Sequence, residues 1–241
     1  MMGRYTESDW GDPMNHIVLL GDSIFDNGIY VHQDRGEEPV LEQLRGLLPG
    51  GWDATLVAVD GHRIADVCRQ LDRAPAEASH LVISVGGNDA LGQGSVLDGR
   101  AGTVSDALVT LARTREKFRR EYRQMLDTVC ARGKATVACT IYDRCPLGAE
   151  WGLPDEGGVL QAAVAVFDDL IIGEAIRVGV PVLDLRPICD DPADYSDKSP
   201  IEPSAVGGAK IARAIWRIVA GHDFARRQTV VFGSEMLDPV G

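Results

Sequence analysis

The chain has 241 residues, of which 45% are hydrophobic and 25% are charged, a composition typical of a globular protein with a sizeable core. Its 36 acidic residues outnumber its 24 basic residues and give a formal net charge of −12. Binding to a nucleic-acid backbone depends on clustered Lys and Arg. We therefore expect no nucleic-acid partner.

The termini and the cysteines suggest a compartment. No apolar run approaches the ~18 residues of a membrane span, and the N-terminus lacks a basic region followed by an apolar one. The five cysteines are scattered without Cys-x-x-Cys spacing, which is typical of reduced thiols and not of disulfides or a zinc site. We expect a cytoplasmic protein with no membrane partner, no metal and no organic cofactor.

Five short apolar runs are predicted to be strands. Each is rich in Val, Ile or Leu and almost free of charge, as in strands that are buried on both faces. They are Ile17–Leu20, Thr55–Val59, Leu81–Val85, Ala135–Ile141 and Val180–Leu185.

Segments of helical period separate these runs. The apolar stripes lie within Leu41–Leu48, Phe118–Val129, Val159–Val178 and Ile211–Val219. Strands that alternate with helices predict βαβ units and a five-stranded parallel sheet. We expect one domain over residues 14–222, after a disordered polar leader over residues 1–13. In the tail, residues 223–241, the apolar run Thr229–Phe232 is either an edge strand or a contact for a partner.

Two longer segments fit neither strand nor helix. Leu91–Val104 and Asp143–Gly158 are rich in Gly or Pro, and each follows a predicted strand. Parallel α/β sheets bind ligands at the carboxyl ends of their strands. The two segments are therefore either walls of a substrate pocket or long surface loops.

Ser23 is the first residue along the chain that suggests a catalytic role. It follows Gly21 and Asp22 directly after the first predicted strand, where the chain would turn sharply into a helix. A nucleophilic serine needs such an exposed turn and nearby donors for the developing oxyanion. Alternatively, Asp22 or Ser23 simply caps the next helix.

Asn88 and Gly61 favour the nucleophile. Asn88 follows Gly86-Gly87 at the end of the third run, and its amide can donate to an oxyanion. Gly61 follows the second run and could present its N–H to the same point. The alternative for Asn88 is an Asn-Asp turn with local hydrogen bonds.

These residues resemble the ordered blocks of the SGNH, or GDSL-type, hydrolase family. Gly21-Asp22-Ser23-Ile24 is similar to its first block, Gly61 to the glycine of its second, and Gly86-Gly87-Asn88-Asp89 to its Gly-x-Asn-Asp block. The resemblance covers about residues 15–220. It implies a flavodoxin-like three-layer α/β/α sandwich with Ser23 as nucleophile. The Ser23 N–H, the Gly61 N–H and the Asn88 amide would form the oxyanion hole.

The last block departs from the family pattern of Asp-x-x-His. Ser199 stands at the Asp position and Glu202 at the His position, before Pro203-Ser204 and a predicted helix. An ordinary Glu has a pKa of ~4.3, so it accepts a proton less readily than a His of pKa ~6.5. Burial could raise that pKa. Glu202 is therefore either an atypical base or a helix N-terminal residue that the helix dipole favours.

His62, directly after Gly61, is the other candidate base, or a contact for the substrate together with Asp22 and Ser199. His32, after the Ser23 turn, is a further candidate for the pocket lining.

We expect a hydrolase or acyltransferase that forms a Ser23 acyl-enzyme with a small ester, thioester or acetylated small molecule. A rival hypothesis is a catalytically impaired pseudoenzyme that binds an acylated ligand or acts as an interaction module. A flavin or nucleotide binder is a third alternative, although no Gly-Lys-Ser/Thr loop follows the first strand. The sequence leaves the oligomeric state open.

Overall fold

The structure is a computed structural model that describes residues 15–94, 99–144 and 158–237. The predicted leader, residues 1–13, lies outside these ranges, as does most of the segment Asp143–Gly158.

One parallel sheet forms the centre of the described chain. It has six strands in the order β2-β1-β3-β4-β5-β6. The strands are β1 (Asn15–Gly21), β2 (Trp52–Leu56), β3 (His80–Ser84), β4 (Ala135–Cys139), β5 (Val182–Leu183) and β6 (Val231–Phe232). All five apolar runs therefore contribute a strand, but the expected number of five strands is wrong. The sixth strand comes from the C-terminal tail, where it pairs with β5 at the sheet edge.

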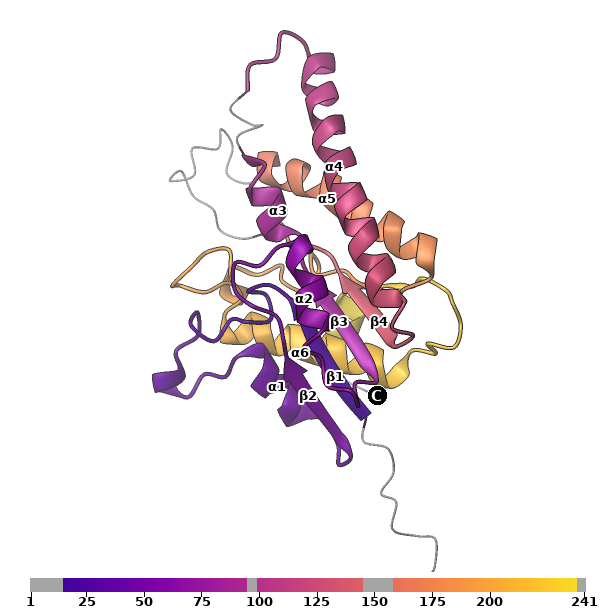
Figure 1. Ribbon diagram of the computed structural model, residues 1–241. Helices are drawn as coiled ribbons and strands as arrows, with labels where there is room; N and C mark the ends of the chain where they lie inside the picture. Colours follow the sequence, from indigo (N-terminus) through magenta and orange to yellow (C-terminus); the bar gives the residue numbers. More distant parts are fainter. Residues whose placement is uncertain (1–14, 95–98, 145–157, 238–241) are drawn as a thin grey trace, which may run out of the picture.

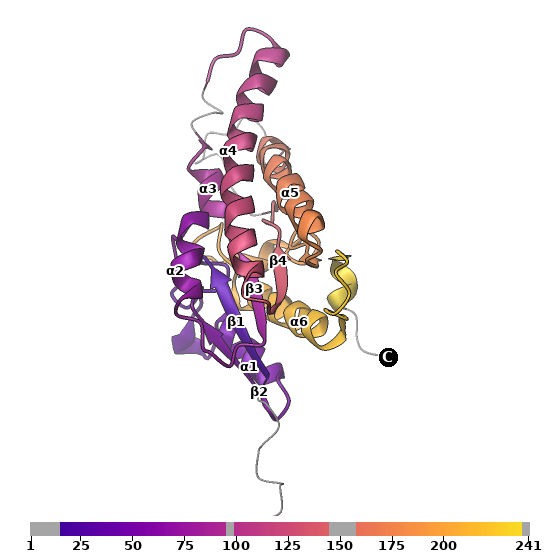
Figure 2. The same cartoon turned by 45° about the vertical axis from the view of Figure 1, so that its right-hand side comes forward.

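Helices cover both faces of the sheet (Figure 1 and Figure 2). The helices are α1 (Val40–Leu47), α2 (Val67–Leu71), α3 (Gly87–Leu91), α4 (Val104–Cys130), α5 (Gly158–Val178) and α6 (Ala205–Gly221). Short 3-10 helices are η1 (Gln33–Arg35), η2 (Ile64–Asp66), η5 (Pro192–Asp194) and η6 (Ser234–Leu237). The predicted three-layer α/β/α sandwich is confirmed.

The alternation of side chains along the strands separates the core into two main clusters. Ile17 and Leu19 of β1 pack on the face covered by α1 and α6. Val18 and Leu20 of the same strand pack on the other face, covered by α2, α4 and α5. Because both faces are covered, the strand is apolar throughout, which explains why it could be predicted from its composition.

The strand order places a topological switch point between β1 and β3. The chain passes from β1 outward to β2, and then returns to form β3 on the other side of β1. Ligand sites in such sheets lie at the carboxyl ends of the strands next to the switch point. Ser23 follows β1 and Asn88 follows β3, so both lie at this edge.

The long helix α4 begins with a capping box, in which Thr103 Oγ1 accepts the Asp106 N–H and the Asp106 carboxylate accepts the Thr103 N–H. Its first turns project past the sheet (Figure 1). Within the described residues, no helix combines the length and apolar character that crossing a bilayer requires. The four described cysteines, Cys68, Cys130, Cys139 and Cys189, are free thiols.

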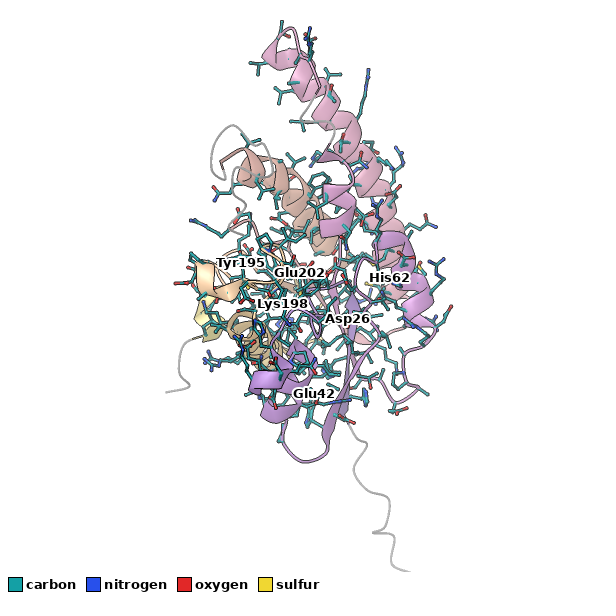
Figure 3. The ribbon with its side chains drawn as sticks, turned by 90° about the vertical axis from the view of Figure 1, so that its left-hand side faces the viewer. Asp26, Glu42, His62, Tyr195, Lys198 and Glu202 are labelled. Atoms are coloured by element: carbon teal, nitrogen blue, oxygen red, sulfur yellow. The ribbon has the colours of Figure 1, made fainter. Side chains whose placement is uncertain are left out.

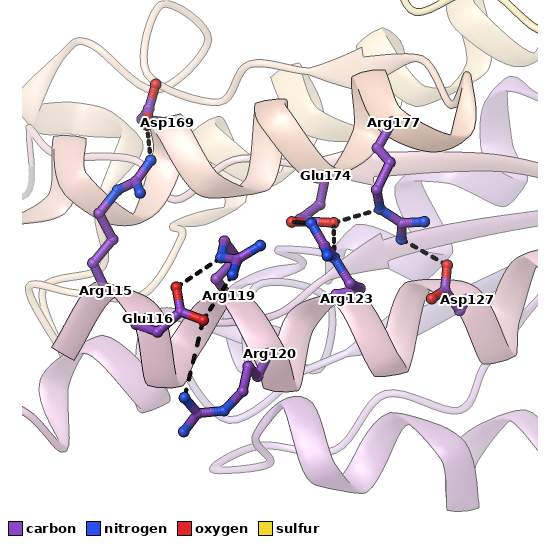
Figure 4. A network of polar contacts seen from close by, with 9 residues as sticks. All are labelled: Arg115, Glu116, Arg119, Arg120, Arg123, Asp127, Asp169, Glu174 and Arg177. Atoms are coloured by element: carbon purple, nitrogen blue, oxygen red, sulfur yellow. Dashed lines mark hydrogen bonds and ion pairs between the residues drawn. The ribbon is translucent and has the colours of Figure 1, made fainter. Parts of the chain in front are cut away.

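An ion-pair network joins α4 to α5 (Figure 4). The Glu174 side chain is only 4% exposed and accepts two hydrogen bonds from Arg123, at 2.9 and 2.8 Å, and one from Arg177 at 2.7 Å. Although burial opposes the ionised form, these two arginines lower the pKa of Glu174. The network therefore favours the carboxylate.

We predict that Glu174→Gln lowers the free energy of unfolding by about 1.5–3 kcal/mol at pH 7, the range for hydrogen bonds to charged groups. Because the pKa is lowered in the folded state, this contribution is present above the unfolded value of ~4.3 and is lost as the pH falls through the folded value. Urea unfolding of both proteins from pH 3 to 7 measures it. Glu42→Gln, which removes an exposed ion pair with Arg45, should change the free energy by less than ~1 kcal/mol. An equal effect of both substitutions at pH 7 would contradict the prediction.

Candidate active site

The turn that carries Ser23 begins where β1 ends. Gly21 has φ +130°, and a Cβ at this position would lie 1.7 Å from the Ser84 carbonyl oxygen of β3. The same oxygen accepts the Asp22 N–H at 3.1 Å. Only glycine allows both this backbone conformation and this close approach. The two neighbouring strands therefore set the direction in which Asp22 and Ser23 leave the sheet.

Asp22 shapes the turn itself. Its side chain accepts the Ile24 N–H at 3.2 Å, and its carbonyl accepts the N–H groups of Phe25 and Asp26. The Ser23 N–H, by contrast, makes no hydrogen bond among the described residues. It is therefore free to bind a ligand.

Gly61 lies in a tight turn in which the His62 N–H donates to the Val59 carbonyl at 3.1 Å. Its φ of +76° favours glycine. In the described parts of the chain the Gly61 N–H also has no hydrogen-bond partner. Two of the three donors expected from the sequence are thus available.

Asn88, in α3, is the third donor. Its Nδ2 donates to the His62 carbonyl at 3.0 Å. A carboxamide nitrogen carries two hydrogens, so one remains available. This hydrogen bond brings the Gly61-His62 turn and the Asn88 amide together.

Glu202 is held by the backbone on both sides. Its N–H donates to the Ser199 carbonyl at 3.1 Å, and its carbonyl accepts the Ser196 N–H at 2.8 Å. The next residue, Pro203, pairs with Tyr195 in an isolated antiparallel bridge and accepts a hydrogen bond from Asn27 at 3.2 Å. This turn buries the Glu202 side chain, which is 6% exposed, just before α6.

Glu202 and Ser23 interact directly. Burial raises the pKa of Glu202 to about 7, a hydrogen bond with the Ser23 side chain opposes that shift, and the charge of Asp60 adds to it. The Oε2 atom of Glu202 is buried without a hydrogen-bond partner in the described structure. An unsatisfied buried oxygen of this kind is ready to accept a proton.

Further carboxyl groups surround this pair. Burial raises the pKa of Asp22 to about 8, and the charges of Glu202 and Asp89 add to the effect. Burial also raises the pKa of Asp89. Tyr30 donates to Asp60 at 2.9 Å, and burial together with that bond raises the pKa of Tyr30 to about 12. The site therefore carries several acidic groups close to one hydroxyl.

The structure brings most of the predicted residues together. In the view of Figure 3, Glu202, His62 and Asp26 lie near the middle of the molecule, and Glu42 of α1 lies below them. His32 instead contacts Asp197 at 2.9 Å. The Ser199 carbonyl supports Glu202, while its side chain forms no hydrogen bond in the described structure. Among the described residues, no group of three or more His, Cys, Asp or Glu side chains is placed to hold a metal ion.

Two features of the site are not predictable from the sequence. Tyr30 and Asp60 are joined by a hydrogen bond across 30 positions of the chain, and Gln70 in α2 binds both Gly21 and His62. Neither contact leaves a local pattern in the sequence, because each joins residues that only the fold brings together.

We predict that Asp22→Asn becomes increasingly stable relative to the unchanged protein as the pH rises. Because the pKa of Asp22 is raised in the folded state, the stability that its proton supplies is present below the unfolded value of ~3.9 and is lost as the pH rises towards about 8. Asn keeps the acceptor for Ile24 and has no proton to lose. Urea unfolding at pH 5 and pH 9 tests this, with Asp53→Asn, at a partly exposed position of β2, as control. A stability difference that does not change with pH would contradict it.

Comparisons with known proteins identify the family and the fold. The model of the GDSL-like lipase/acylhydrolase family matches residues 19–210. The extracellular lipase of Streptomyces rimosus has 18% identity and a TM-score of 0.57, with 82% of this chain and 95% of that chain covered. The acetyl xylan esterase Axe2-W215I of Geobacillus stearothermophilus has 15% identity and a TM-score of 0.59, with 86% and 95% covered.

Phospholipase A1 of Streptomyces albidoflavus NA297 has 18% identity and a TM-score of 0.56, with 81% of this chain and 94% of that chain covered. A search of curated protein sequences gave no match. At these identities the solved structures establish the fold, and the family model covers most of the chain, including the Ser23, Gly61, Asn88 and Glu202 positions. The chain belongs to the GDSL-like lipase/acylhydrolase family, a family of hydrolases.

Proposed function

We propose that the protein cleaves small esters through a Ser23 acyl-enzyme, with Glu202 as the base. The observation that carries the proposal is the buried Glu202 carboxyl beside the Ser23 hydroxyl, with its pKa raised to about 7. A general base is most effective when its pKa lies near the working pH. Burial thus compensates for the weak basicity of an ordinary glutamate.

In the first half-reaction, Ser23 Oγ bonds to the ester carbonyl carbon while its proton passes to the Glu202 carboxylate. The carbonyl π electrons move onto oxygen, and the oxyanion binds to the N–H groups of Ser23 and Gly61 and to the remaining N–H of Asn88. Each such donor is worth ~10²–10³ in rate. The intermediate then collapses, the bond to the leaving oxygen breaks, and Glu202 returns the proton to the alcohol.

In the second half-reaction, a water or an acceptor hydroxyl attacks the acyl-Ser23 carbonyl and gives its proton to Glu202. Breakage of the Ser23 ester bond releases a carboxylic acid or a new ester, and the proton returns to Ser23 Oγ. The same residues thus serve a hydrolase and an acyltransferase.

The charge of the site narrows the substrate class. The charge of Asp60 raises the pKa of Glu202 and the charge of Asp89 raises that of Asp22, so both carboxylates lie close to the Glu202–Ser23 pair. A negatively charged substrate would be repelled, so we infer a preference for neutral or cationic esters. The acetyl xylan esterase among the structural neighbours supports small acyl groups as substrates.

The free thiols support a cytoplasmic location.

We predict that a fluorophosphonate probe labels the protein and that Ser23→Ala abolishes both labelling and turnover of p-nitrophenyl acetate. The probe reports an activated serine hydroxyl, which alanine lacks. Gel fluorescence and ester hydrolysis measure the two effects. Ser105→Ala, at an exposed position of α4, serves as control and should leave both unchanged. Labelling that persists in Ser23→Ala would rule out Ser23 as nucleophile. A wild-type protein that neither reacts with the probe nor turns over a panel of esters would favour the rival ligand-binding module.

We predict that kcat/KM rises with pH around a midpoint near 7, because the base acts only when Glu202 is ionised. Glu202→Gln should lower kcat by ~10³ or more, since loss of the base in a serine protease costs more than that. Rate profiles from pH 5 to 9 provide the measurement, with the distant Glu42→Gln as control. If the wild-type protein hydrolyses no ester and the Glu202→His variant does, Glu202 does not act as a base.

A further inference from the structure

Gln70 of α2 is fully buried, and its carboxamide binds the end of β1 from the side. Its Oε1 accepts the Gly21 N–H at 2.7 Å, and its Nε2 donates to the Gly21 carbonyl at 2.6 Å. Nε2 also lies 2.9 Å from Nδ1 of His62. One side chain therefore contacts both the residue before the Asp22-Ser23 turn and the residue after Gly61.

The backbone of Gly21 fixes the orientation of this carboxamide. The Gly21 N–H requires an acceptor and the Gly21 carbonyl requires a donor, so the oxygen and nitrogen of Gln70 cannot be exchanged. Nε2 consequently faces His62 Nδ1 as a donor, and Nδ1 must accept. In neutral His62 the proton is then on Nε2. The ring presents a donor to its surroundings and has no free nitrogen to take a proton from Ser23.

His62 connects Gln70 to Asn88. Its carbonyl accepts the Asn88 amide at 3.0 Å, while its ring is held by Gln70. A continuous chain of hydrogen bonds thus runs from Gly21 through Gln70 and His62 to Asn88. It links the three segments that carry Ser23, Gly61 and Asn88.

We propose that Gln70 is a positioning residue that aligns the three oxyanion donors with Ser23. The inference rests on the proposed function. Gln70 is fully buried and has no hydrogen bond to Ser23 in the described structure, so it acts by fixing Gly21 and His62. Oxyanion donors are effective because they are aligned before the reaction, and a displacement of ~1 Å can cost ~10² in rate.

The other end of β1 offers a matched control. Ser79 Oγ accepts the His16 N–H at 2.8 Å and lies 3.1 Å from the His16 carbonyl oxygen, to which it can donate. Ser79 thus binds the two backbone groups of one β1 residue, as Gln70 does, but at the amino end of the sheet. A substitution there tests the loss of such hydrogen bonds without an effect on the oxyanion donors.

The experiment compares Gln70→Met with Ser79→Ala. We expect Gln70→Met to lower kcat ~10–100-fold with KM within about twofold and an unchanged midpoint of the pH profile. Ser79→Ala should lower the Tm yet leave kcat within about twofold, at an equal fraction of folded protein. A Gln70→Met kcat no lower than that of Ser79→Ala would overturn the inference.

If the Gln70→Met protein does not fold, a second variant and a second measurement test the inference. His62→Phe removes the Nδ1 acceptor but keeps the carbonyl that binds Asn88, and it should lower kcat ~3–10-fold. In NMR spectra, the two side-chain amide protons of Asn88 should shift in His62→Phe and stay unchanged in Ser79→Ala.

The NMR readout does not depend on turnover. If the wild-type protein hydrolyses nothing, the proposed function fails while the Asn88 signals still report on the hydrogen-bond chain. Unshifted Asn88 signals in His62→Phe would overturn the role of Gln70 whatever the activity.

Discussion

The interaction on which the site depends is the contact between the buried Glu202 carboxyl and the Ser23 hydroxyl. A carboxyl in water would be ionised and weakly basic at neutral pH, and burial changes that. The fold maintains the burial through backbone contacts: the Tyr195–Pro203 bridge, the Asn27 side chain and the Ser204 cap of α6 all hold the turn that carries Glu202. Ionisation of the buried carboxyl lowers the free energy of unfolding of the protein. Packing in the rest of the domain must offset that loss.

The switch point between β1 and β3 brings the remaining groups to this contact. Gly21 lets β1 approach β3 so closely that the Ser84 carbonyl accepts the Asp22 N–H, and the chain must then turn above the sheet edge. The Gly61 turn and α3 meet beside it through the hydrogen bond between Asn88 and His62. Four segments distant in sequence therefore converge on one hydroxyl, although each supplies only one or two polar groups.

The fold was largely predictable because strands buried on both faces must be apolar along their whole length. Ile17–Leu20 and Leu81–Val85 show this clearly, and the blocks around Ser23 and Asn88 follow them directly. The two-residue strand Val231–Phe232 is too short for such a pattern, so the sequence does not distinguish an edge strand from a partner contact there, and the predicted count of five strands is wrong. Gln70 and Tyr30 could not be found, because their contacts exist only after the strands and helices have packed.

Under the proposed mechanism, electrostatics explains why Ser199 and Glu202 replace the Asp and the His of the family pattern together. A histidine base becomes a cation when it accepts a proton, so a nearby aspartate stabilises it. A glutamate base starts as an anion and becomes neutral, so an aspartate at position 199 would raise its pKa further and keep it protonated at neutral pH. The neutral Ser199 avoids that repulsion. Burial and the charge of Glu202 both raise the pKa of Asp22, so an ionised Glu202 favours the protonated form of Asp22. Glutamate at this position therefore works best without the carboxylate partner that histidine requires.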